Sequence, residues 1–278
     1  MTAALHCYAL GLTRRSKLWM AQRMSLQNSR LKHLDQTRTV DKERYRAELH
    51  AWQYDLLSLQ QAVLRSGGRM IIVAQGMDAA GKGGAIRRLV RRLDPRGYKV
   101  YPIGAPERWE QEKHYLYRFW TKLPSPGELV IFDRSWYGRV LVERIEGFTN
   151  KSRWQQAYRE INEFERALVD DGVLVCKLWF HISKDEQLAR FKARENDPHK
   201  AWKLTDEDWR NREKWDQYIE AAEDLFEQTD RDVAPWTIIA ANCKRYARLE
   251  ALKTVANCLA KEAELKSIDT LPLNKAGN

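Results

Sequence analysis

Residues 70–84 hold the groups best suited to chemistry in this chain. The run Met-Ile-Ile-Val-Ala at 70–74 is short, apolar and β-branched, which predicts a strand. Gly76, Gly81 and Lys82 then follow in the spacing Gly-x-x-x-x-Gly-Lys, and residues 85–93 have the pattern of a helix. In this order, backbone N–H groups and the helix N-terminus surround an anion, and the lysine adds a mobile positive charge. The stretch therefore predicts a phosphate-binding loop.

The residue after the lysine is unusual for such a loop. A Ser or Thr there commonly ligates Mg²⁺, but this chain has Gly83. Another oxygen must then hold the metal, and Asp78 inside the loop is the nearest candidate. The alternative interpretation is a glycine-rich turn with a surface lysine, because so short a motif also arises by chance. As a phosphate loop, the stretch would surround its ligand with Gly76, Ala79, Ala80, Gly81, Gly83 and Gly84.

A second carboxylate follows a second apolar run. Residues 128–133 read Glu-Leu-Val-Ile-Phe-Asp, which predicts a buried parallel strand ending in Asp133. Ligands of doubly wound sheets bind outside the carboxyl ends of the strands, and an acid there often serves the metal of nucleotide-handling proteins. Asp133 is alternatively the N-cap of the helical run that follows, and both roles are compatible. Arg134 and Arg139 are expected to point into the same cleft.

Strands and helices alternate along the rest of the chain. Further strands are predicted at 98–103, 173–182 and 236–240, and helices at 40–65, 107–120, 151–170 and 244–265. Helix 40–65 carries an apolar stripe and ends at Ser66-Gly67-Gly68. The stripe most simply packs on the core, with a coiled-coil or dimer contact as the alternative. The pattern predicts one α/β domain with a parallel sheet.

Residues 184–230 are unusually rich in charges and tryptophans. Asn196-Asp197-Pro198-His199 interrupts this section, which predicts helix, loop and helix. It is either a lid, at about 184–228, or an exposed helical hairpin. As a lid it would bring Arg190, Lys200 and Lys203 over the bound phosphates and exclude water.

Composition narrows the class of protein. The chain has 278 residues, 44% of them hydrophobic and 31% charged, and no apolar run reaches the ~18 residues of a membrane span. The net charge of +10 favours a polyanionic partner. The cysteines are scattered and the first residues lack the pattern of a signal peptide, so we expect a reducing, cytoplasmic location and no membrane partner. We expect a basic, partly disordered extension over 1–36 and a loose tail over 266–278.

Taken together, three segments resemble the polyphosphate kinase 2 family. They are residues 76–84 (Gly-Met-Asp-Ala-Ala-Gly-Lys-Gly-Gly), residues 133–139 (Asp-Arg-Ser-Trp-Tyr-Gly-Arg), and the lid segments 197–203 and 209–212. The second segment is far more specific than the phosphate loop. The resemblance runs from about residue 34 to residue 255, which is most of the chain.

The resemblance implies a fold and a set of roles. It implies a P-loop kinase core like that of thymidylate kinases, a parallel sheet flanked by helices with a helical lid, over residues 37–265. It implies Mg²⁺, or Mn²⁺, with Asp78 and Asp133 as the metal and substrate-orienting pair. It also implies that Lys82, Arg134 and the lid cations bind phosphates, and that the chain forms homodimers or homotetramers.

The implied activity is transfer of a terminal phosphoryl group between inorganic polyphosphate and a nucleotide. Residues 136–144 look most like the subgroup that phosphorylates AMP to ADP, although that subgroup often has two fused domains and this chain has one. ADP, GMP and GDP are further expected acceptors. Two alternatives stay open: an ATP-dependent nucleoside monophosphate kinase, and a non-catalytic P-loop protein that binds nucleic acid. The specific segment at 133–137 argues against nucleic acid as a specific partner.

Overall fold

A parallel sheet forms the centre of the molecule. The computed structural model describes residues 31–269, with side chains to residue 260. In this part of the chain the strands β1 (Arg69–Gly76), β2 (Tyr98–Pro102), β3 (Leu129–Asp133), β4 (Val173–His181) and β5 (Trp236–Ala240) form one five-stranded sheet in the order β2-β3-β1-β4-β5. Every pairing is parallel, as predicted.

The register of the sheet brings the two predicted motifs together. Ile71 of β1 lies between Val130 of β3 and Val175 of β4, and its side chain is completely buried. At the other end of β1, Ala74 pairs with Asp133 and Gly76 pairs with Phe180. The phosphate loop and the end of β3 therefore leave the sheet side by side, at the edge formed by the carboxyl ends of the strands.

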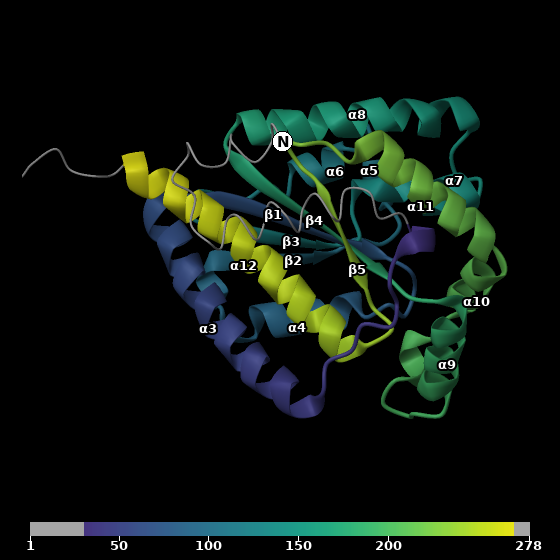
Figure 1. The fold of residues 1–278 in the computed structure, drawn as a ribbon. Coiled ribbons are helices and arrows are strands. Elements are labelled where there is room, and N and C mark those ends of the chain that lie inside the picture. Colours follow the sequence, from purple (N-terminus) through teal and green to yellow (C-terminus); the bar gives the residue numbers. More distant parts are fainter. Residues whose placement is uncertain (1–30, 270–278) are drawn as a thin grey trace, which may run out of the picture.

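Helices cover both faces of the sheet (Figure 1). One face carries α3 (Lys42–Ser66), α4 (Lys82–Leu89) and α12 (Lys244–Asp269), and the other carries α8 (Lys151–Asp170) and α11 (Trp215–Thr229). Leu56 and Val63 on the apolar stripe of α3 are 0% and 2% exposed, and α3 lies along α12. The core-packing interpretation of this stripe is confirmed. The helix ends where Gly67 takes the left-handed conformation, with φ 66°.

The predicted helix at 107–120 is wrong. Residues there form two single-turn helices, α5 (Arg108–Gln111) and α6 (Tyr117–Trp120). The buried Glu110 carboxylate lies 3.2 Å from Arg118 Nε. Eight residues of one continuous helix would rise about 12 Å, so the chain has to turn back between them. The helical run after Asp133 is likewise a 3₁₀ helix, η4 (Trp136–Val140), followed by α7 (Val142–Ile145).

The charged section folds as a string of helices beside the sheet. It comprises α9 (Lys184–Glu195), η5 (Ala201–Lys203) and α10 (Asp206–Glu213), and α11 leads back to the domain. Figure 1 shows α9 and α10 projecting at one side of the sheet. Within residues 31–269, no helix combines the length and the apolar character that crossing a bilayer requires.

Both ends of the described chain are helical. In η1 (Leu31–His33), Leu31 is 5% exposed and its N–H donates to Glu223 Oε1 at 3.0 Å. At the other end α12 continues to Asp269. The remainder of the predicted extension and tail, 1–30 and 270–278, lies outside the described residues.

Two short 3₁₀ helices, η2 (Val90–Arg92) and η3 (Pro95–Gly97), connect α4 to β2.

Candidate active site

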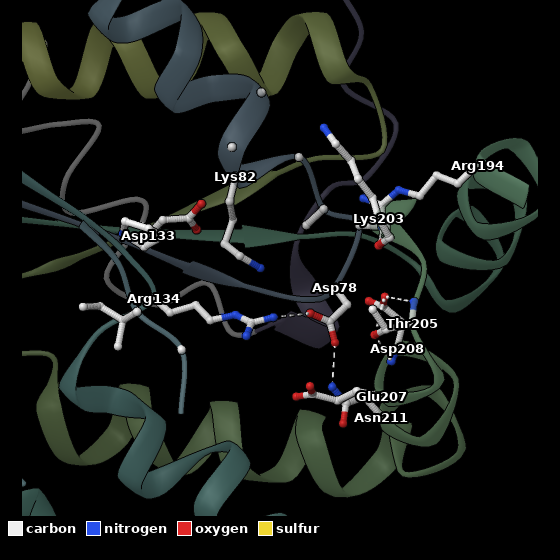
Figure 2. Close-up of a pocket in the computed structure, with 18 residues that line it drawn as sticks. Asp78, Lys82, Asp133, Arg134, Arg194, Lys203, Thr205, Glu207, Asp208 and Asn211 are labelled. Atoms are coloured by element: carbon white, nitrogen blue, oxygen red, sulfur yellow. Dashed lines mark hydrogen bonds and ion pairs between the residues drawn. The ribbon is translucent and has the colours of Figure 1, made fainter. Parts of the chain in front are cut away.

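A cavity of about 540 Å³ opens at the carboxyl ends of β1, β2 and β3. Figure 2 shows side chains converging on it from the phosphate loop, the end of β3 and the predicted lid at about 184–228, which is called the lid below. The phosphate loop contributes residues 78–84, the ends of β2 and β3 contribute 102–104, Asp133 and Arg134, and the lid contributes Arg194, Lys203, Thr205, Glu207, Asp208 and Asn211. Four cationic side chains, those of Lys82, Arg134, Arg194 and Lys203, therefore share this cavity with several acidic side chains.

Glycines shape the predicted phosphate loop. Gly76 has φ 138° and packs so closely on the backbone of Phe180 that a side chain would overlap it. Gly81 has φ 106° and is the N-cap of α4. The first N–H groups of a helix have no intrahelical partner, so those of residues 82–84 are available to an anion. The loop has the conformation that the predicted phosphate site requires.

Side-chain donors form hydrogen bonds with the backbone carbonyl groups of the loop. The Lys82 ammonium donates to Gly76 O at 2.7 Å and to Met77 O at 3.1 Å. Gln187 of α9 donates to Asp78 O at 3.1 Å. With these oxygens bonded to donors, the loop presents N–H groups rather than carbonyls to a ligand. Burial lowers the pKa of Lys82, and the nearby Asp78 opposes that shift.

Arg190 is not placed to bind phosphate, contrary to the sequence-based prediction. Its side chain is 4% exposed beneath the loop and does not line the cavity. Its guanidinium donates to Ala79 O and Ala80 O at 2.8 and 3.0 Å and to Ala241 O and Asn242 O at 2.6 and 2.9 Å. Nε pairs with Glu186 at 2.6 Å. Because every nitrogen of the guanidinium already has a partner, Arg190 acts as a brace that fixes the loop.

Asp78 is held at the centre of the site. Arg134 Nη2 lies 3.5 Å from Asp78 Oδ1, and Asn211 Nδ2 donates to Asp78 Oδ2 at 2.8 Å (Figure 2). Arg134 has φ 67°, a strained conformation for a non-glycine residue, which aims it across the cavity.

A buried polar network anchors the segment that carries Arg134. Trp136 Nε1 and Tyr137 OH both donate to Glu165 Oε1, at 3.0 and 2.7 Å. The Lys177 ammonium pairs with Glu165 Oε2 at 2.7 Å, with both side chains at most 3% exposed. Burial lowers the pKa of Lys177, and Glu165 counteracts this shift. The network holds η4 against β4 and α8. Because Arg134 lies two residues before η4, its backbone is held in place as well.

Asp133 ends β3 with a carboxylate that faces the start of α4. A side chain at Gly83 would lie 3.7 Å from Asp133 Oδ2, so the two positions are neighbours. Among residues 31–269, no group donates a hydrogen bond to this carboxylate. Mg²⁺ prefers oxygen ligands and is usually held by one or two carboxylates together with substrate phosphates. Asp133 and Asp78 fit such an ion, and the described residues contain no larger cluster of metal-binding side chains.

Two other predicted phosphate ligands lie outside the cavity. Arg139 pairs with Glu143 at 2.9 Å, donates to Thr149 Oγ1 at 2.6 Å and lies over the Tyr115 ring. Lys200 is exposed and pairs with Asp197. The expectation that Arg139 points into the cleft is wrong, because its partners turn it toward α7. Lys203, by contrast, lines the cavity as predicted.

Several residues that line the cavity were not predicted. Arg194 follows Arg190 by one helical turn, a spacing that is visible in the sequence. Thr205 and Asp208 form the capping box of α10, and their Thr-x-x-Asp spacing is also readable there. Burial raises the pKa of Asp208, and the charge of Asp78 acts in the same direction. Asn211 lies in segment 209–212 of the family resemblance, but that resemblance gave a role only to the cations of the segment. Glu207 lies outside the segments that carry the resemblance.

Comparison with known protein families matches residues 39–267 to Polyphosphate kinase 2 (PPK2). The chain belongs to this family. Polyphosphate:AMP phosphotransferases of Acinetobacter johnsonii and Pseudomonas aeruginosa are 55% and 48% identical to it, over 69% and 82% of the chain. The alignments cover 40% and 46% of those two proteins, so the chain spans less than half their length. An ADP-polyphosphate phosphotransferase of P. aeruginosa is 41% identical, over 77% of the chain and 70% of that protein.

Solved structures of the PPK2 family share the fold. A crystal structure described as polyphosphate kinase 2 of P. aeruginosa superposes with a TM-score of 0.82 at 46% identity, over 85% of this chain and 52% of that one. A polyphosphate kinase 2 of Arthrobacter aurescens gives 0.81 at 32% identity, over 90% and 89% of the two chains. The predicted α/β fold with a parallel sheet flanked by helices is confirmed.

Proposed function

We propose that this chain transfers a terminal phosphoryl group between inorganic polyphosphate and a nucleotide, with AMP to ADP as the main reaction. The observation that carries the proposal is the cavity in which Lys82, Arg134, Arg194 and Lys203 converge around a phosphate loop. Relatives named polyphosphate:AMP phosphotransferases support AMP as acceptor. The relative named an ADP-polyphosphate phosphotransferase supports ADP to ATP as a second reaction.

The residues of the cavity suit a transfer between two anions. Such a reaction requires alignment and charge neutralisation more than proton transfer, because a nucleotide phosphate is already ionised at neutral pH. The loop N–H groups and Lys82 bind one phosphate, and Arg134 binds a second across the cavity. Arg194 and Lys203 reach the cavity from the lid and stabilise charge on the transferred group.

Asp78 and Asp133 would hold Mg²⁺ in this site. When bound, the ion neutralises charge on the phosphate oxygens and so lowers the repulsion between donor and acceptor. Asp133 has no competing hydrogen-bond donor among the described residues, which leaves its oxygens available. Arg134 and Asn211 both contact the Asp78 carboxylate.

We further propose a cytoplasmic location for the protein. We also propose an assembly of two or four copies, which a measurement of the molecular mass of the purified protein in solution tests.

The deciding experiment offers the purified protein polyphosphate and Mg²⁺ with AMP, ADP, GMP or GDP in separate reactions. Chromatography of the products should show ADP from AMP as the fastest reaction. A parallel series replaces polyphosphate by ATP as donor, which separates this function from that of an ATP-dependent nucleoside monophosphate kinase. Absence of product from every acceptor with polyphosphate would contradict the proposal.

A further inference from the structure

We propose that Asn211 is a positioning residue for this reaction: it fixes the Asp78 carboxylate from the lid and is itself fixed by Tyr218. The inference rests on the proposed function for its catalytic consequence, but the contact itself is a property of the fold. Asn211 lies on α10 and Tyr218 on α11, whereas Asp78 lies in the phosphate loop.

A chain of hydrogen bonds links the three side chains. The Tyr218 hydroxyl donates to Asn211 Oδ1 at 3.1 Å, and Asn211 Nδ2 donates to Asp78 Oδ2 at 2.8 Å. Asn211 is only 9% exposed. Arg134 approaches the other oxygen, Asp78 Oδ1, at 3.5 Å, and Figure 2 shows the carboxylate between these two partners. Each Asp78 oxygen therefore has its own donor, one from the lid and one from the end of β3.

The chemistry of the partners requires an amide in this place. An ionised carboxylate only accepts hydrogen bonds, so the Asn211 NH₂ group must face Asp78. The Asn211 oxygen is then left facing the phenol, which can donate to it. An aspartate at 211 would place a second negative charge against Asp78, and an apolar residue would leave one Asp78 oxygen without its donor.

A second observation shows why the carboxylate needs this contact. A smaller cavity of about 70 Å³ adjoins Asp78, Asn211 and Tyr218, and Lys82 is not among the residues that line it. Leu141, Val142 and Trp179 form part of its wall, and the buried Trp179 Nε1 has no hydrogen-bond partner among the described residues. This space lies beside the Asp78 side chain and offers room into which that side chain can rotate. Asn211 keeps the carboxylate in the large cavity instead.

The backbone of Asp78 does not depend on Asn211. Gln187 of α9 already bonds to Asp78 O, and it is 1% exposed. Removal of the Asn211 amide should thus free the carboxylate without unfolding the loop. This separation makes the inference testable by kinetics, because substrate binding by the loop and the orientation of Asp78 are affected by different substitutions.

The test compares Asn211→Leu and Tyr218→Phe with Glu213→Gln, an exposed residue at the end of the same helix that lies outside both cavities. Loss of a group that orients a site ligand typically costs 10–100-fold. We expect kcat for AMP to fall about 10–100-fold in Asn211→Leu and less in Tyr218→Phe, with KM for polyphosphate within about twofold of wild type. Glu213→Gln should match wild type, and all variants should melt as cooperatively as wild type.

A crystal structure of Asn211→Leu gives a readout that does not depend on activity. We expect the Asp78 side chain to turn toward the smaller cavity while the loop backbone stays in place. An unmoved Asp78, or a kcat equal to that of an active wild type, would overturn the inference and leave the proposed function intact. A wild-type protein without transferase activity would contradict the proposed function, and the crystal structure would still decide the role of Asn211.

Discussion

Two lysines three residues apart, Lys200 and Lys203, show how single residues of the lid differ. In the sequence they are equivalent cations of one charged loop. In the structure Lys203 lines the large cavity, whereas Lys200 pairs with Asp197 on the surface. Lys200 precedes η5 as its N-cap residue and pairs back to Asp197, whereas Lys203 is the last residue of η5, where the chain turns into α10.

This placement predicts different effects of two alanine substitutions. We expect Lys203→Ala to raise KM for polyphosphate about tenfold, because a cation is lost beside a polyanion in a partly enclosed site. Lys200→Ala should change KM by less than about twofold, since exposed ion pairs contribute little. Steady-state kinetics with polyphosphate as the varied substrate measures both. Equal effects of the two substitutions would contradict the different roles assigned to these lysines.

Asp133 gives the sharpest prediction for a single residue. Asp133→Asn keeps the size of the side chain but removes the charge that would hold Mg²⁺, so we expect kcat for transfer to fall by at least about 100-fold. The thermal unfolding midpoint should stay within a few degrees of wild type, because no described group bonds to this carboxylate. Full activity of the variant would rule out Asp133 as a metal ligand.

For single residues, the sequence identifies the members of a motif better than it identifies their hydrogen-bond and ion-pair partners. Lys82, Asp78 and Asp133 are found because the glycines and the strand ends leave a spaced pattern. Arg139 and Arg190 are misassigned because the sequence does not show that Glu143 and the loop carbonyls already occupy them. The loop carbonyls that accept from Arg190 lie more than a hundred positions away in the chain, whereas Arg139 is turned by the nearby Glu143, and the spacing alone does not tell which of two possible directions an arginine takes.

Among the elements, the segment β3–η4 is held in place by a buried ion pair. It rests on the Lys177–Glu165 pair, which joins β4 to α8, and the Glu165 carboxylate accepts hydrogen bonds from Trp136 and Tyr137. The sequence predicted each of these strands and the helix α8 within a few residues, because their apolar periodicity is strong. It did not predict the pair, since a lysine inside a buried strand has no pattern of its own. The break in the helix at 107–120 was missed for a similar reason, because the Glu110–Arg118 contact that accompanies it leaves no pattern in the sequence.

We expect Lys177→Met to destabilise the fold by about 3–5 kcal/mol, because it leaves the Glu165 carboxylate buried without its cation. Urea unfolding followed by circular dichroism measures the change. The double variant Lys177→Met with Glu165→Leu should recover part of the lost stability, since the unpaired charge is then gone. If the single variant unfolds at the same urea concentration as wild type, the pair does not support the segment.

The whole molecule combines a basic surface with a buried neutral histidine. His181 at the end of β4 is 7% exposed, and burial lowers its pKa to about 4. A histidine whose pKa is lower in the folded state binds protons more readily when unfolded. Its effect on stability is therefore absent above the unfolded pKa of about 6.5, and it destabilises the fold progressively as the pH falls toward 4.

The loss of stability between pH 6.5 and pH 4 should reach roughly 3 kcal/mol from this residue. Urea unfolding of wild type and of His181→Leu across this range tests the prediction. The variant should lose less stability than wild type between the two pH values, whatever its stability at pH 7. Parallel curves for the two proteins would show that His181 is not the group responsible.

Arg190 has a consequence for attempts to move this loop into another protein. The short glycine-rich segment looks like a portable module, since its own residues supply the N–H groups. The carbonyls of residues 78–80, however, accept hydrogen bonds from Gln187 and Arg190, more than a hundred positions later in the chain, and Arg190 is held in turn by the carbonyls of residues 241 and 242 after β5. A graft of residues 76–84 alone would transfer the sequence motif without the contacts that hold its conformation. The transferable unit is the loop together with α9 and the turn at 241–242.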